Sequence, residues 1–86
     1  MFSPAPQALM SALQLGQLLK SARKRGRLTQ ADVAARLGLS QNRVSHLESH
    51  PDELSFRQLL AWCAAVGLEL SLAERSTTEP ASRSEW

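Results

Sequence analysis

Residues 29–48, TQADVAARLGLSQNRVSHLE, decide the fold that we predict for this sequence. Apolar or small residues recur three and four positions apart in each half of the stretch, as on one face of a helix. They are Val33, Ala34 and Leu37 in the first half, and Val44 and Leu47 in the second. Between the halves, Gly38 suits the left-handed backbone that ends a helix, and Ser40 is a natural N-cap for the next one. The stretch therefore predicts two short helices joined by a tight turn.

The second of these helices leaves a polar face that the core does not need. Gln41, Asn42, Arg43, Ser45 and His46 lie on that face, and each can hydrogen-bond a base edge or a phosphate. Two helices joined in this way, the second one polar and exposed, indicate a helix-turn-helix. In that motif the second helix is the recognition helix, which enters the major groove of DNA.

The same stretch resembles the Cro and XRE-like class of phage repressors. The likeness is carried by Thr29-Gln30 at the start of the first helix, by Ala34 and Gly38, and by the Val44…Leu47-Glu48 ending. The resemblance implies an all-α, lambda-repressor-like bundle of four to five helices. It also implies that Gln30 contacts the DNA backbone and braces the recognition helix.

Charge is distributed very unevenly along the chain, although the net charge is only +2. Residues 20–43 hold seven lysines and arginines against Asp32 alone, whereas residues 44–86 hold three arginines against seven acids. The positive half coincides with the helix-turn-helix, which favours a polyanion as the partner of this half. For a helix-turn-helix we expect that polyanion to be double-stranded DNA. A basic solvated face without a partner is the alternative. The cluster Arg23-Lys24-Arg25 can complement a helix dipole, and it can also contact phosphates.

Length and composition exclude several other classes of protein. Eighty-six residues make one small domain, for which dimerisation is a source of added stability. The single cysteine, Cys63, cannot form a disulfide within the chain, and no Cys/His cluster has zinc spacing, so we expect a cytoplasmic protein without metal or cofactor. No apolar run approaches the roughly 20 residues of a membrane span. The tetrapeptide Ser21-x-x-Lys24 lacks the companion motifs of a serine acylase, so we expect no enzyme.

Composition divides the chain into three predicted parts. Residues 1–10, with Pro4 and Pro6, are predicted to be a flexible arm, residues 11–74 a DNA-binding and dimerisation domain, and residues 75–86 a disordered tail.

The first helix should begin between Ser11 and Leu15 and reach about Arg25, where Gly26 ends it. Cap and staple patterns place further helix starts at 29, 40 and 55, with ends near Ser49 and before Gly67. In the last helix Cys63 should be buried, and Trp62 belongs either to the core or to a dimer interface.

After Gly67 the period changes, because Leu68, Leu70 and Leu72 alternate with polar residues. This alternation predicts a half-buried β-strand. A lone strand cannot satisfy its backbone, and no second strand is predicted elsewhere in the chain. The simplest partner is the same segment of a second copy, which would give an antiparallel ribbon between two subunits about a two-fold axis. An irregular tail packed on the core is the alternative.

Eight residues form the predicted DNA-binding set: Thr29, Gln30, Ser40, Gln41, Asn42, Arg43, Ser45 and His46. The N-terminus of the helix that follows Thr29 suits a phosphate. Glutamine and asparagine pair with adenine, and arginine pairs with guanine. Ser40 is a cap first, and His46 faces phosphate or solvent. Which of the others read bases and which touch phosphates is left open.

Taken over its whole length, the chain resembles the HipB-like antitoxins. The shared features are a Ser-Pro arm, four helices, the Pro51-Asp52 loop, the Leu-Glu-Leu-Ser segment after Gly67 and the terminal Glu85-Trp86. The resemblance implies a dimeric autorepressor on a palindromic operator, and DNA binding would associate such a protein with the nucleoid. It also implies a HipA-type serine/threonine kinase toxin as partner, with Trp86 docking on it. A stand-alone XRE-family repressor is the alternative, as is an interaction module without DNA binding, against which Gln41, Asn42 and Arg43 argue.

Overall fold

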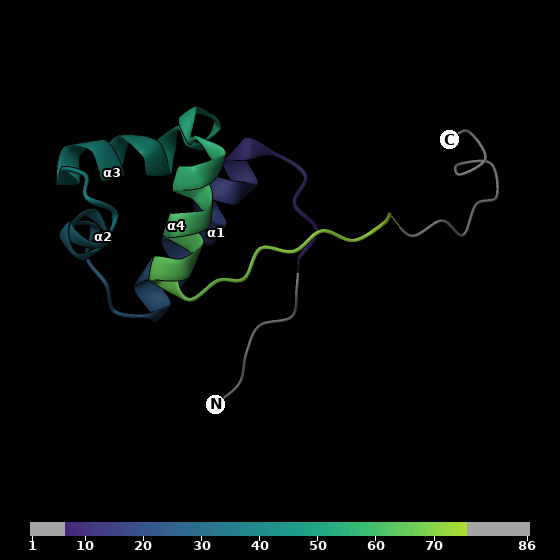
Figure 1. Cartoon of the computed structure of the whole chain (residues 1–86), viewed down its shortest axis with the longest axis horizontal. Coiled ribbons are helices and arrows are strands. Elements are labelled where there is room, and N and C mark those ends of the chain that lie inside the picture. The colour runs from purple at the N-terminus through teal and green to yellow at the C-terminus, as the bar shows by residue number, and fades with distance from the viewer. Residues whose placement is uncertain (1–6, 76–86) are drawn as a thin grey trace.

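The structure, a computed structural model, describes residues 7–75 and contains four α-helices and one 3-10 helix in that range (Figure 1). In chain order they are α1 (Ala12–Arg25), α2 (Gln30–Leu37), α3 (Gln41–Ser49), η1 (Pro51–Glu53) and α4 (Phe56–Val66). The all-α bundle and the helix-turn-helix of α2 and α3 that the sequence predicts are confirmed. No helix in the described range is long and apolar enough to cross a membrane.

Every α-helix begins at a hydroxyl residue that caps its free backbone N–H groups. The caps are Ser11, Thr29, Ser40 and Ser55, and each accepts a hydrogen bond from the backbone N–H three residues on. Two of them form full capping boxes, because Asp32 and Gln58 return a bond to the cap backbone. Helix starts at 29, 40 and 55 were predicted from these patterns and are confirmed. The first helix also starts within its predicted window.

Three helices end in the same left-handed turn. Leu28, Leu39 and Leu68 each donate their backbone N–H to the carbonyl five residues back, at 3.0, 2.9 and 2.8 Å, as in a Schellman motif. Gly38 and Gly67 take the left-handed position after α2 and α4, with φ of 70° and 81°. After α1 the left-handed residue is Arg27, with φ of 59°, whereas Gly26, the predicted end of that helix, is its C-cap with φ of −84°. Helix α1 still ends at Arg25. Gly26 is its C-cap, and in a Schellman motif the left-handed residue comes directly after the C-cap.

The core lies where the four α-helices meet. Nine buried apolar residues form it, namely Leu19, Ala22, Val33, Ala34, Val44, Leu47, Trp62, Cys63 and Val66. Helix α2 packs mainly on α3 and α4, and α1 packs on α3 and α4. Trp62 is fully buried, so it belongs to this core, and the predicted burial of Cys63 is confirmed. Helix α3 contacts this core only through its inner face, with Val44 and Leu47.

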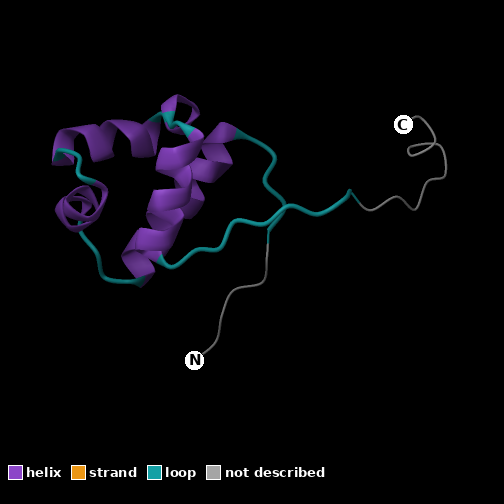
Figure 2. Cartoon of the chain, viewed as in Figure 1, coloured by secondary structure: helices purple, strands orange, loops and turns teal. Residues whose placement is uncertain are grey.

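The strand predicted at Leu68, Leu70 and Leu72 is not formed in the single chain. Residues 68–75 leave α4 as a loop, and no β-strand occurs within residues 7–75 (Figure 2). Leu68 and Leu70 pack partly against the core, whereas Leu72 is 98% exposed. A strand needs the backbone of a neighbour, and no described segment offers one. Pairing with a second copy stays a prediction, and Trp86 lies outside the described residues.

Candidate nucleic-acid interface

Helix α3 separates its residues sharply between two faces. Val44, Leu47 and Glu48 are buried, whereas the exposed residues are all polar: Gln41, Asn42, Arg43, Ser45, His46 and Ser49. Five of these six belong to the predicted DNA-binding set. The outer face of α3 thus offers hydrogen-bond donors and acceptors that have no part in the core, as a helix in the major groove requires.

A buried ion pair fixes the C-terminal end of α3. The Glu48 carboxylate accepts hydrogen bonds from Arg23 Nε at 2.6 Å and from Arg23 Nη2 at 3.2 Å. Arg23 Nη1 also donates to the Leu28 carbonyl at 3.0 Å. Of the two interpretations of the Arg23-Lys24-Arg25 cluster, phosphate contact is therefore wrong for Arg23, which is buried in this pair. No local pattern in the sequence indicates this partner, because it lies 25 residues away.

Gln30 connects the same carboxylate to the start of α2. Its Nε2 donates to Glu48 Oε1 at 3.1 Å, which is the kind of bracing contact that the resemblance to the phage repressors implied. Glu48 is thereby held from α1 and from α2 at once. A contact between Gln30 and DNA stays a prediction.

Gly16 in α1 lets the end of α3 approach the α1 backbone closely. A Cβ atom added at Gly16 would lie 2.6 Å from the Glu48 carbonyl oxygen and 3.1 Å from Pro51 Cγ. Neither distance would be tolerated without movement. The position of α3 therefore depends on a glycine in the middle of α1 as well as on the side chain of Glu48.

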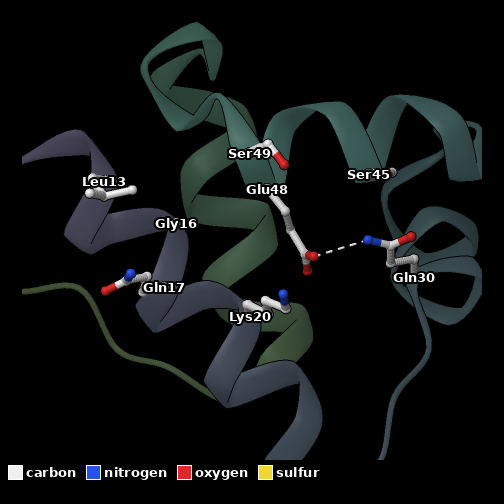
Figure 3. Close-up of a pocket in the computed structure, with 8 residues that line it drawn as sticks. All are labelled: Leu13, Gly16, Gln17, Lys20, Gln30, Ser45, Glu48 and Ser49. Carbon is white, nitrogen blue, oxygen red and sulfur yellow. Dashed lines mark hydrogen bonds between the residues drawn. The ribbon is translucent and has the colours of Figure 1, made fainter.

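An open groove of about 430 Å³ runs between α1, the start of α2 and α3 (Figure 3). Its lining residues are Leu13, Gly16, Gln17, Lys20, Gln30, Ser45, Glu48 and Ser49. Gln30 and Ser45 come from the predicted set, whereas Gln17 and Lys20 were not predicted as site residues. They share one face of α1 at helical spacing, but only the packing of α1 beside α3 places them on the same groove as Gln30. Amide and ammonium donors beside a helix N-terminus suit a phosphate.

His46 is engaged within the chain. Its Nε2–H donates to Glu53 Oε1 at 2.9 Å, and its ring stacks on that of His50 with a centroid distance of 4.3 Å. The hydrogen bond from His46 lowers the pKa of the Glu53 carboxyl, with charge from His46, His50 and Arg43 adding to the effect. His50 also donates its Nδ1–H to the His46 carbonyl at 3.1 Å. These contacts tie the last turns of α3 to η1.

Thr29 and Ser40 cap the starts of α2 and α3 with their side chains. Thr29 Oγ1 accepts from the Asp32 backbone at 3.0 Å, and Ser40 Oγ accepts from the Arg43 backbone at 3.0 Å. The backbone hydrogen bond from Thr29 lowers the pKa of the Asp32 carboxyl. A negative charge therefore already lies at the start of α2. Gln41, Asn42 and Arg43 form the first turn of α3, and all three are exposed.

The comparison with protein families decides the class of this fold. A family model described as a helix-turn-helix domain matches residues 14–76, which is most of the chain. The chain belongs to the helix-turn-helix domain family. This confirms the helix-turn-helix that the sequence predicts at residues 29–48.

Among the relatives of this helix-turn-helix domain are two HipB antitoxins from Escherichia coli. The antitoxin of strain O6:H1 is 26% identical over 74 residues, which cover 86% of this chain and 79% of the relative. That of strain K12 is 25% identical over 76 residues, which cover 88% and 86%. The resemblance to HipB-like antitoxins that the sequence suggests is thus found by direct comparison.

Two solved structures share the fold of the helix-turn-helix domain. A chain of the HipA-HipB-O2-O3 complex matches with a TM-score of 0.73 and 24% identity, covering 81% of this chain and 99% of that one. A chain of the HipB-O1-O2 complex matches with a TM-score of 0.71 and 25% identity, covering 79% and 99%. Nearly the whole of each solved chain therefore has a counterpart here.

Proposed function

We propose that this helix-turn-helix domain is a HipB-like antitoxin that represses its own promoter as a dimer on a palindromic operator. In this proposal it is a cytoplasmic regulator and not an enzyme, and it neutralises a HipA-type serine/threonine kinase toxin. The observation that carries the proposal is the outer face of α3, which is wholly polar while its inner face and its end are fixed in the fold. The similarity to two HipB antitoxins supports the antitoxin role.

In the proposed complex, α3 lies in the major groove with its first turn toward the bases. Gln41 and Asn42 would pair with adenine and Arg43 with guanine, each pairing contributing about 1–3 kcal/mol of discrimination. Ser45 and His46 lie further along the same face, and Thr29 and Ser40 present the starts of their helices. Two copies joined through Leu68, Leu70 and Leu72 would place their recognition helices about 34 Å apart, one turn of the duplex.

Phosphate contacts would come from the groove beside α3. Gln30, Gln17 and Lys20 present amide and ammonium donors on its walls. Such contacts position the helix without reading the sequence. Lys20 therefore contributes to affinity for any duplex in this proposal, whereas Gln41 and Arg43 contribute to choice among sequences.

The DNA-binding part is tested by fluorescence anisotropy with the chain's own upstream DNA and a scrambled duplex, each at two salt concentrations. Binding should weaken steeply with salt, because release of counterions drives it. Lys20→Ala should weaken binding to both duplexes and reduce the salt slope by about one unit. Gln41→Ala should weaken binding to the upstream DNA alone. Arg75→Ala, which removes a charge outside the helices, is the matched control and should change neither. Binding that does not depend on salt contradicts the proposal.

The antitoxin part is tested by co-purification with the product of the neighbouring gene. A kinase-like protein should be retained by the full chain and lost or weakened when Trp86 is deleted, because the resemblance assigns the docking to that residue. A chain that binds its operator but retains no neighbouring product is a stand-alone repressor. That outcome keeps the DNA-binding proposal and removes the toxin from it.

A further inference from the structure

The ring of His46 is held in one orientation, although 42% of its side chain is exposed on the outer face of α3. Its Nε2 lies 2.9 Å from Glu53 Oε1 on η1. The ring of His50 stacks on it, with a centroid distance of 4.3 Å and an interplanar angle of 12°. His50 is itself tied to α3 by the bond from its Nδ1 to the His46 carbonyl. The His46 ring is therefore restrained at one nitrogen and on one face, and it presents a fixed edge to solvent.

The bond to Glu53 decides which ring nitrogen of His46 carries the proton. An ionised carboxylate only accepts hydrogen bonds, so Nε2 donates and the neutral ring has its proton on Nε2. The hydrogen bond from His46 lowers the pKa of Glu53 below its ordinary 4.5, so this carboxylate is ionised at higher pH. Nδ1 of the neutral ring is then an acceptor, and within residues 7–75 it has no hydrogen-bond partner. Because the two nitrogens diverge across the ring, Nδ1 points away from Glu53.

A free acceptor suits one class of group on DNA. The neutral ring has no N–H left for a phosphate, because its single N–H is bonded to Glu53. The negative charge of Glu53 beside the ring also repels a phosphate. In the major groove, adenine and cytosine present an amino donor, whereas guanine and thymine present keto acceptors and no donor. The structure therefore favours an amino group of a base over the phosphate or solvent that the sequence predicted for His46.

His46 also lies on the side of α3 that is proposed to meet the bases. Residues four apart on a helix share one side, so His46 follows Asn42 along the outer face, one turn further on. Both residues are exposed. A helix that places Asn42 against a base edge brings His46 toward the next part of the same groove.

We propose that Glu53 is a specificity-determining positioning residue, which fixes His46 as an acceptor so that His46 selects adenine or cytosine at one operator position. This inference rests on the proposed DNA binding and adds the chemistry read by His46 and a residue outside α3 that sets it. Protonation of His46 puts an N–H on both nitrogens. The selected bases then change to guanine or thymine, whose keto oxygens accept.

The groups that can titrate near His46 are few. Glu53 approaches it from η1, Arg43 lies three residues before it on α3, and His50 stacks on it. The other charged groups on α3 and on the elements packed against it are Glu48 on α3, Asp52 on η1, Asp32 and Arg36 on α2, and Lys20, Arg23, Lys24 and Arg25 on α1. Within residues 7–75 none of these forms an ion pair or hydrogen bond with either histidine ring. A change of base preference between about pH 5 and about pH 8 therefore reports one of the two histidines, since only histidine ordinarily titrates there.

The first test selects binding sites for the full chain from a library of randomised duplexes at about pH 8 and about pH 5, the range in which histidine changes charge. His46→Ala identifies the position that His46 reads, because the preference there is lost. At about pH 8 the wild type should prefer adenine or cytosine at that position about 3- to 10-fold, as one hydrogen bond provides. At about pH 5 it should prefer guanine or thymine.

Two variants separate Glu53 and His50 in the same selection. Glu53→Gln should lose the preference at about pH 8, because an amide can accept from Nε2 or donate to it and no longer fixes the proton. His50→Phe keeps an aromatic ring against His46 and cannot titrate, so its change of preference with pH should persist. If that change is lost in His50→Phe, or the preference at about pH 8 survives in Glu53→Gln, the inference is wrong.

The second test needs neither DNA nor a substitution in His46. Nitrogen-15 NMR of the imidazole rings shows which nitrogen is protonated, and His50→Phe assigns the signals of the two histidines in the chain. His46 in the wild type should carry its proton on Nε2 at about pH 8. In Glu53→Gln the proton should be shared between both nitrogens. A wild-type ring protonated on Nδ1 overturns the inference.

The outcomes distinguish this inference from the proposed function. A chain that selects no sequence from the library overturns the proposed DNA recognition, and the inference with it. A chain that selects a clear sequence while His46→Ala alters no position overturns the inference alone. A preference for guanine or thymine at about pH 8 does the same.

Discussion

Gly16→Ala should destabilise the protein, although alanine is the better helix former. Glycine in a helix interior ordinarily costs about 0.8–1.0 kcal/mol relative to alanine, so helix propensity alone predicts a more stable variant. Here the new Cβ would lie 2.6 Å from the Glu48 carbonyl oxygen, whereas ordinary contacts begin at 3.4 Å. A backbone atom cannot rotate away, so α1 and the end of α3 must separate.

The magnitude follows from the two opposing terms. Overpacking that forces the backbone to shift costs about 1–3 kcal/mol, which exceeds the gain in helix propensity. We therefore expect Gly16→Ala to lower the free energy of unfolding by about 1 kcal/mol. Because the displaced element is the end of α3, operator binding should weaken as well, and by more than binding to a scrambled duplex.

Urea denaturation followed by circular dichroism measures the free energy of unfolding, with Gly26→Ala as the control. Gly26 has φ of −84°, and the nearest heavy atom to a Cβ there is 3.6 Å away. That variant should match the wild type or exceed it by about 0.4–1 kcal/mol. If Gly16→Ala is stabilised to the same extent as Gly26→Ala, the close approach of α1 and α3 does not exist and the reasoning fails.

Three further predictions concern other contacts. Glu48→Met should cost about 3–5 kcal/mol of stability, since it leaves Arg23 buried without a partner, and Arg23→Met/Glu48→Met should recover much of that loss in urea denaturation. Arg27→Gly should raise the thermal midpoint and the stability by up to about 1 kcal/mol, because glycine relieves the left-handed backbone of φ 59°; an unchanged midpoint contradicts this. The hydrogen bond from His46 lowers the pKa of Glu53 below its ordinary 4.5. The stabilisation that this hydrogen bond contributes is therefore present above pH 4.5 and is lost as the pH falls through the folded-state pKa of Glu53. Glu53→Gln should accordingly flatten the pH dependence of the free energy of unfolding in that range.

The helices could be predicted from the sequence because their signals are local. A cap such as Thr29 and its partner Asp32 are three residues apart, and Gly38 follows directly on the helix that it ends. The separation of α3 into an apolar and a polar face likewise depends only on helical spacing. Both the motif and most of the candidate DNA-binding face follow from these local features without any tertiary contact.

The features that position this face could not be predicted in the same way. The pair of Arg23 and Glu48 joins residues 25 positions apart, and its burial follows from how α1 crosses α3. The role of Gly16 and the placing of Lys20 in the groove depend on that same crossing. The segment at Leu68 to Leu72 raises a different problem, since the backbone partner that a strand needs is not part of the same chain.

The division of α3 into a fixed inner side and a free outer side bears on how such regulators diversify. Residues that hold the helix, such as Val44, Leu47 and Glu48, are separate from those that face outward. Substitutions on the outer side can therefore change the preferred duplex with little loss of folding stability. After duplication of its gene, one copy of such a chain could bind a different operator through a few substitutions on the outer side of α3, while the fold stays the same.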